Sequence, residues 1–126
     1  MAIRPCRVLV IDDDQDTAQT LAYLLVGMGH EATFLTDPSQ ALETARRTRP
    51  HIIFLDLGMP GMNGWDVAKM LRKEYPVDGR LCLVAVSGHS DQDARVKSRQ
   101  AGFDAHVVKP VAVDLVEAII KQLVRE

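Results

Sequence analysis

The sequence predicts an α/β fold in which one parallel β-sheet of five strands carries helices on both faces. Five short apolar runs alternate with five segments of helical periodicity, and no repeat or low-complexity segment interrupts them. The chain has 126 residues, a length that suits one domain with one core. Parallel strands joined by right-handed helical crossovers are the usual outcome of such an alternation. We therefore expect a single doubly wound domain over residues 1–126.

The composition is typical of a soluble globular protein, with 47% hydrophobic and 25% charged residues. A formal net charge of −2 gives no reason to expect binding to nucleic acid or to a bilayer. The N-terminus lacks the apolar stretch of a signal peptide, and no segment approaches the length of a membrane span. Cys6 and Cys82 have no metal-binding spacing and are expected in or near the core. We expect a cytoplasmic protein, or a cytoplasmic part of a larger one.

The five strands are expected where short runs are apolar and often β-branched: residues 7–11, 31–35, 51–55, 81–86 and 104–108. The run from Ile52 to Leu55 is bounded by Pro50 and Gly58, which is typical of a strand buried on both faces. The strand at 31–35 is short and is expected near an edge of the sheet.

Three of the helices begin at recognisable capping residues. Asp14 is expected to cap the first helix, and Asn63 the helix at about 64–75. Thr36 or Asp37 is expected to cap the second helix, with Pro38 at its first position.

The last two helices are expected at residues 91–100 and 114–124. Residues at helical spacing are expected to face the sheet. They are Leu21, Leu24, Leu25 and Met28 in the first helix, Ala41, Leu42 and Ala45 in the second, Trp65, Val67, Ala68, Met70 and Leu71 in the third, and Leu115, Val116, Ile119, Ile120 and Leu123 in the last.

Polar side chains follow four of the predicted strands. Asp12 and Asp13 come after the first strand, Asp56 after the third, Ser87 after the fourth and Lys109 after the fifth. In open parallel sheets the ligand site lies outside the carboxyl ends of the strands. The sequence therefore predicts that these residues form one site.

Three carboxylates in one site repel each other, by roughly 4 kcal/mol for each pair at ~4 Å and an effective dielectric constant near 20. A divalent cation removes that penalty, and Mg²⁺ favours oxygen ligands shared between carboxylates and a phosphate. Lys109 adds a positive charge and Ser87 a hydroxyl donor, both suited to phosphoryl oxygens. Asp56 is the candidate nucleophile, because a carboxylate can form a covalent acyl phosphate.

These motifs resemble the receiver domains of two-component response regulators. The resemblance covers about residues 6–125 and is carried by Asp12-Asp13, by Asp56-x-x-Met59-Pro60-Gly61-Met62-x-Gly64, by Ser87 and by Lys109-Pro110. Each motif is weak by itself, but all four in order at strand ends are specific. The family implies a flavodoxin-like strand order of 2-1-3-4-5.

The resemblance also implies a function, that of a phosphoacceptor module in a two-component phosphorelay. Asp56 would accept a phosphoryl group from a phosphohistidine on a histidine kinase or a histidine phosphotransfer protein. Asp13, Asp56 and the backbone carbonyl of Gly58 would bind Mg²⁺, and Asp12 would assist through water. Such a module is no enzyme in the usual sense, since it catalyses only its own phosphorylation and dephosphorylation.

The remaining motif residues would bind the phosphate and transmit the signal. Ser87 and Lys109 would bind the phosphoryl oxygens, and a cis peptide bond between Lys109 and Pro110 would aim the lysine. Ser87 and His106, three residues before the lysine, would act as switch residues. His106 stands where the family often has Tyr or Phe, and the alternative is that it is simply a half-exposed strand residue. His89 is either a loop residue or one that tunes phosphoryl lifetime.

Two other classes of protein share features with this sequence. A flavodoxin-like redox protein would need a Ser/Thr/Gly loop after the first strand, where three aspartates would repel a flavin phosphate. A haloacid-dehalogenase-type phosphatase uses a strand-terminal Asp with Mg²⁺, but its DxDx[TV] motif fails because Thr17 comes one place early.

The context of the domain stays open at this stage. The chain is either a stand-alone regulator or the receiver of a hybrid histidine kinase. Its oligomeric state is also open, with a dimer through the fourth helix, the fifth strand and the fifth helix as one alternative. The resemblance names these three elements as the output face.

Overall fold

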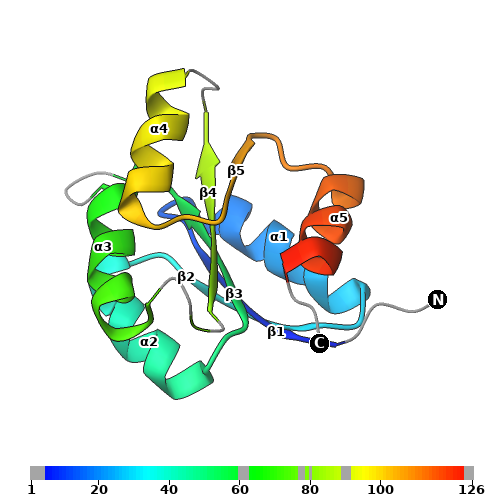
Figure 1. Cartoon of the computed structure of the whole chain (residues 1–126). Helices are drawn as coiled ribbons and strands as arrows, with labels where there is room; N and C mark the ends of the chain where they lie inside the picture. The colour runs from blue at the N-terminus through cyan, green and yellow to red at the C-terminus, as the bar shows by residue number, and fades with distance from the viewer. Residues whose placement is uncertain (1–4, 60–62, 77–78, 80, 89–91, 124–126) are drawn as a thin grey trace.

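The structure is a computed structural model that describes residues 5–59, 63–76, 79, 81–88 and 92–123. Figure 1 shows a central sheet with helices on both sides. The strands are β1 (Arg7–Ile11), β2 (Glu31–Leu35), β3 (Ile52–Asp56), β4 (Cys82–Ser87) and β5 (Ala105–Val108). The helices are α1 (Gln15–Gly27), a 3₁₀ turn η1 (Pro38–Gln40), α2 (Ala41–Thr48), α3 (Gly64–Glu74), α4 (Gln92–Ala101) and α5 (Val113–Leu123).

All pairings in the sheet are parallel, and the strand order is β2-β1-β3-β4-β5, as expected. The first two strands have the predicted bounds. β3 and β4 each run one residue further than predicted, to Asp56 and Ser87, because both residues still take part in strand pairing. The two polar residues thus belong to the rigid sheet edge and not to the loops beyond it.

Two apolar clusters cover the two faces of the sheet, with α1 and α5 on one side and α2, α3 and α4 on the other (Figure 1). On the α1 face, Phe54 packs among side chains of α1 and α5. On the opposite face, Leu55 and Leu83 pack against α2 and α3. Burial on both faces explains why β3 is a continuous apolar run, as the sequence analysis expected.

The predicted helix caps are confirmed at the described residues. Asp14 accepts a hydrogen bond from the backbone N–H of Asp16, and Asn63 accepts one from that of Asp66. Asp37, not Thr36, caps the second helical segment, whose first turn is the 3₁₀ turn η1.

Two of the residues expected to face the sheet do not. Leu24 of α1 is 38% exposed and Leu115 of α5 is 41% exposed. In α1 the buried stripe is shifted by three residues towards the N-terminus, to Ala18, Leu21, Ala22 and Leu25, so Leu24 lies on its flank. Ala18 and Ala22 belong to the buried stripe. The prediction counted only the large apolar residues of α1 and therefore placed the stripe too far towards Leu24. The cysteine prediction holds, since Cys6 is buried, Cys82 is partly buried and both are free thiols.

Candidate functional site

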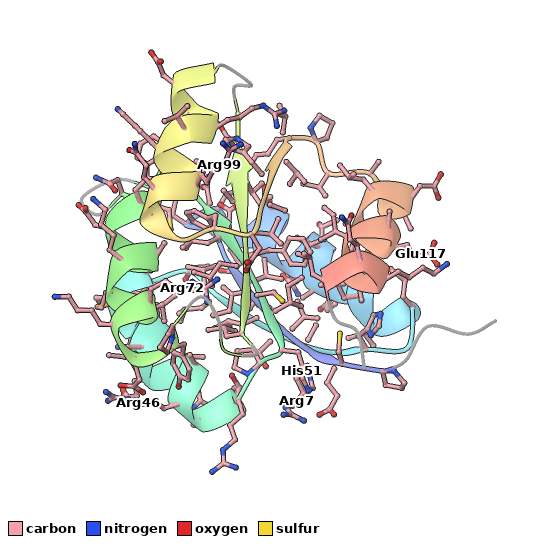
Figure 2. The ribbon with its side chains drawn as sticks, in the orientation of Figure 1. Arg7, Arg46, His51, Arg72, Arg99 and Glu117 are labelled. Carbon is pink, nitrogen blue, oxygen red and sulfur yellow. The ribbon has the colours of Figure 1, made fainter. Side chains whose placement is uncertain are left out.

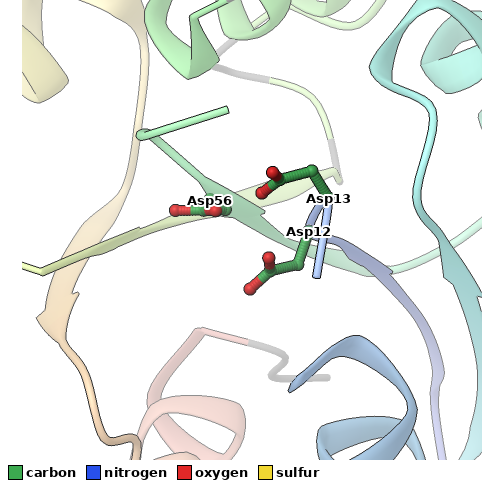
Figure 3. Close-up of side chains that lie close together, drawn as sticks. All are labelled: Asp12, Asp13 and Asp56. Atoms are coloured by element: carbon green, nitrogen blue, oxygen red, sulfur yellow. The ribbon is translucent and has the colours of Figure 1, made fainter. Parts of the chain in front are cut away.

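Three carboxylates converge at the carboxyl edge of the sheet. One side-chain oxygen of each of Asp12, Asp13 and Asp56 lies within 4.8 Å of the others, and Figure 3 shows the three side chains gathered there. They come together because β1 pairs with β3, so that the residues after Ile11 lie beside the end of β3. Asp12 and Asp56 are buried, whereas Asp13 is exposed.

The Lys109 ammonium group bridges two of these carboxylates. Its Nζ lies 3.1 Å from Asp12 Oδ2 and 3.4 Å from Asp56 Oδ2. The peptide bond between Lys109 and Pro110 is cis, as the resemblance implied. One cation shared between two buried carboxylates leaves the cluster with net negative charge, which favours a further cation.

The ionisation of this group reflects its burial. Burial raises the pKa of Asp12, as does the charge of Asp56, against the opposing effect of a backbone hydrogen bond from Asp14 and the contact with Lys109. Burial lowers the pKa of Lys109, but the hydrogen bond and charge of Asp12, together with Asp56, outweigh it, so the net shift is upward. A raised pKa favours the neutral form of Asp12 and the charged form of Lys109, so both shifts reduce the net negative charge of the site.

The start of α3 is packed directly against the phosphoacceptor candidate. Asp56 Oδ1 accepts a hydrogen bond of 3.1 Å from the backbone N–H of Gly58. A Cβ at Gly64 would lie 2.6 Å from the carbonyl oxygen of Asp56 and 2.8 Å from Cα of Leu57. The sequence analysis placed Gly64 in the loop motif but did not predict this contact, which requires glycine.

Ser87 and His106 lie on one face of neighbouring strands. His106 pairs with Ala85, and Ser87 lies two residues further along β4, so both side chains point to the α3–α4 side of the sheet. Ser87 is buried at the strand end, and His106 is partly buried. His106 precedes Lys109 by only three residues, but it does not belong to the carboxylate cluster. Its contact with Ser98 of α4 was not predicted.

A cavity of about 600 Å³ opens beside the carboxylates, between α1 and the segment that follows β5. Asp12, Asp56 and Lys109 line one end, and apolar side chains such as Leu24 and Val111 line the other. This cavity could not be predicted from the sequence, because it depends on how α1 packs against residues about 90 positions away. Pro60, Gly61, Met62 and His89, which the sequence analysis also singled out, lie outside the described residues.

The carboxylate cluster suits a hard divalent cation. Its three side chains offer only oxygen ligands, and Asp13 remains exposed, so that water and a substrate oxygen can complete the coordination.

In the part of the chain that the structure describes, no helix is both long and apolar enough to cross a membrane.

Residues 8–121 of this chain match the family model of the response regulator receiver domain. A DNA-binding response regulator MtrA of Mycolicibacterium smegmatis is 38% identical over 104 residues, which are 82% of this chain and 44% of that protein. The transcriptional regulatory protein PrrA of Mycobacterium leprae is 37% identical over 119 residues, which are 94% of this chain and 50% of that protein. The chain therefore spans about half the length of these curated relatives.

Solved structures agree on the fold. The chemotaxis protein CheY4 of Vibrio cholerae superposes with a TM-score of 0.87 at 21% identity, covering 95% of this chain and 99% of that one. A CheY-like receiver domain protein of Methanospirillum hungatei superposes with a TM-score of 0.83 at 26% identity, covering 95% and 94%. Neither the flavodoxin-like redox protein nor the phosphatase weighed above finds support in these matches. The chain belongs to the response regulator receiver domain family, the signalling modules of two-component systems.

Proposed function

We propose that Asp56 is the residue that accepts the phosphoryl group, from a phosphohistidine on a histidine kinase or a histidine phosphotransfer protein. The observation that supports this most strongly is the position of Asp56 between a cation and two further carboxylates. Its Oδ2 lies 3.4 Å from Lys109 Nζ, and its carboxylate belongs to the cluster with Asp12 and Asp13. It is also the last residue of β3, which fixes its backbone.

In the reaction an Asp56 carboxylate oxygen attacks the phosphorus of the donor. The new O–P bond forms as the P–N bond of the phosphohistidine breaks, and the released imidazole nitrogen takes up a proton. The Lys109 ammonium group lies close enough to Asp56 to stabilise the negative charge on the phosphoryl oxygens during transfer. Ser87, at the end of the adjacent strand, contributes a hydroxyl donor.

Asp12, Asp13 and Asp56, with the backbone carbonyl of Gly58, would hold Mg²⁺. When bound, this ion supplies positive charge that offsets the repulsion between the carboxylates and the incoming phosphoryl oxygens. The backbone N–H of Gly58 already donates to Asp56 Oδ1, which orients the carboxylate. Burial of Asp12 and Asp56 keeps the site's electrostatic interactions strong.

The protein catalyses only its own phosphorylation and dephosphorylation, and it works in the cytoplasm, where a histidine kinase obtains its ATP. The output face is formed by α4, β5 and α5, a face on which Val96, Val113 and Leu115 expose apolar side chains. This face could also form the interface of a dimer. We do not propose nucleic-acid binding by this stretch, although MtrA, of which it covers 44%, is named a DNA-binding response regulator.

Intact mass spectrometry tests the proposal. We expect the parent to gain one phosphoryl group from acetyl phosphate or phosphoramidate in the presence of Mg²⁺ and none after chelation. Asp56→Asn should gain none, whereas Asp16→Asn should react like the parent, because Asp16 lines the same cavity without joining the cluster. An Asp56→Asn protein that still becomes phosphorylated would refute the assignment.

A further inference from the structure

Three polar side chains connect α3, α4 and β5 on the face of the sheet opposite α1 and α5. The indole N–H of Trp65 donates to Ser98 Oγ at 3.2 Å, and the same oxygen lies 3.2 Å from His106 Nδ1. Ser98 is only 2% exposed, so its hydroxyl is shielded from water. An indole nitrogen can only donate, so Ser98 Oγ accepts from Trp65 and is held in place for His106.

Both ends of this network lie close to the phosphoacceptor site. Trp65 is the second residue of α3, directly after Gly64, which packs against the backbone of Asp56. His106 precedes Lys109 by three residues on β5, and Lys109 contacts Asp12 and Asp56. A displacement of either segment on phosphorylation would therefore reach Ser98, which belongs to α4.

The His106 ring also has space beside it. A cavity of about 230 Å³ lies between α4 and β5, and Ser98, Phe103 and His106 are among the residues that line it. A ring that rotated within this space would carry its Nδ1 away from Ser98 Oγ and would alter the α4–β5 surface, which belongs to the output face.

We propose that Ser98 is a positioning residue that anchors the His106 ring in the unphosphorylated chain, and that phosphorylation reaches α4 by releasing this contact. The inference rests on the proposed function, because phosphorylation of Asp56 is its trigger. A hydrogen bond present in one of two states shifts their populations by its net strength, here roughly 2- to 10-fold. Removal of the Ser98 hydroxyl should therefore favour the released arrangement.

Trp65 supplies a direct readout, because it is the single tryptophan of the chain. Its indole N–H gives one cross-peak in a ¹H–¹⁵N NMR spectrum, whose position depends on the hydrogen bond to Ser98. The Lys97 ammonium group lies 5.2 Å from the centre of the indole ring, so the signal also reports on α4.

The experiment compares this cross-peak in the full chain before and after treatment with acetyl phosphate and Mg²⁺, with the added phosphoryl group verified by intact mass. Ser98→Ala should move the peak even without phosphorylation, and should reduce its phosphorylation-dependent shift at least twofold. His106→Phe, which keeps the Trp65–Ser98 bond, should leave the starting peak near that of the parent and abolish most of the shift. Ser39→Ala, which removes an exposed hydroxyl outside the network, should behave like the parent.

Two results would overturn the inference: a Ser98→Ala peak at the parent's position before phosphorylation, or a full phosphorylation-dependent shift in His106→Phe. Failure of the proposed function is recognised separately, because the mass would then show no added phosphoryl group in the parent. In that case the comparison of unphosphorylated Ser98→Ala with the parent still tests the hydrogen bond between Trp65 and Ser98.

Discussion

The two ends of the sheet differ in how their polar groups are satisfied. At the carboxyl edge, Asp12, Asp13 and Asp56 crowd together with Lys109 as the contacting cation, so like charges face one another. At the amino edge, Arg72 pairs with Asp104, and the Nδ1 atoms of two histidines accept from backbone N–H groups, although Nε2 of His30 is buried without a hydrogen-bond partner among the described residues. The difference separates a site arranged to bind something from an edge arranged to hold the fold together.

Arg72 illustrates the amino edge. Its guanidinium donates to the carbonyl oxygens of Gly102 and Leu81 and forms an ion pair of 2.8 Å with Asp104, which also accepts from the backbone N–H of Leu83. The side chain of Arg72 is 8% exposed and lies in the interior of the molecule in Figure 2. It ties α3 to the segments that enter β4 and β5.

Two histidines satisfy backbone groups at the same edge. His30 Nδ1 accepts from the backbone N–H of Cys6, and His51 Nδ1 accepts from that of Arg7. Figure 2 shows Arg7 and His51 next to each other at this end of the sheet. These imidazoles therefore have structural roles.

The largest expected effect is at the amino edge. Arg72→Ala should lower the free energy of unfolding by about 3 kcal/mol, because it removes the ion pair with Asp104 and leaves the carbonyl oxygens of Gly102 and Leu81 without their donor. Urea denaturation measures the loss. The matched control is Arg46→Ala, which removes an exposed ion pair with Glu74 and should cost far less. Similar losses in the two variants would contradict the distinction between a structural and a superficial pair.

A smaller effect is expected at the carboxyl edge, and it should combine stability with function. Gly64→Ala forces a Cβ against the carbonyl of Asp56 and should cost about 1–3 kcal/mol. Displacement of Asp56 should also slow phosphoryl uptake, measured by the rate of mass gain. Gly27→Ala, whose Cβ would meet no atom within 4 Å, serves as the control: it should leave phosphoryl uptake unchanged and should not lower stability. Normal uptake in Gly64→Ala would show that the contact does not position Asp56.

The smallest of these effects is a pH dependence at the amino edge. Burial holds the pKa of His30 below its ordinary value, against a weaker opposing effect of Glu117. The folded state therefore favours neutral His30, and its contribution to stability is present above about pH 6.5 and is lost as pH falls through the lower folded pKa. Urea midpoints between pH 7.5 and pH 5 should fall more steeply in the parent than in His30→Gln. Equal slopes would assign the acid sensitivity to other groups.

The sequence was sufficient to predict the sheet because its strands are short apolar runs whose spacing leaves few alternatives. The same holds for the carboxylate cluster, since Asp12 and Asp56 each follow or end such a run and parallel strands place their ends together. The pairing of Arg72 with Asp104 could not be predicted, because the two residues are 32 positions apart and an arginine in an amphipathic helix usually faces water.

Two further features depended on packing detail. Leu24 was expected inside because it fits the helical spacing, but the alanines of α1 moved the buried stripe away from it. Trp65 was assigned to packing from its position on α3, and its hydrogen bond to Ser98 depends on the tertiary approach of α3 to α4. Sequence periodicity identifies which side of a helix is apolar but not which polar atoms meet across two helices.

The most direct test of the account is the effect of Mg²⁺ on stability in the parent and in Asp13→Asn. Without Mg²⁺, the variant should be the more stable of the two, because it relieves repulsion within the cluster. With Mg²⁺ at 100 times its dissociation constant, the parent should gain about 2.7 kcal/mol and the variant much less. A parent that gains nothing from Mg²⁺, or a variant that gains as much, would contradict the claim that these carboxylates form a magnesium site.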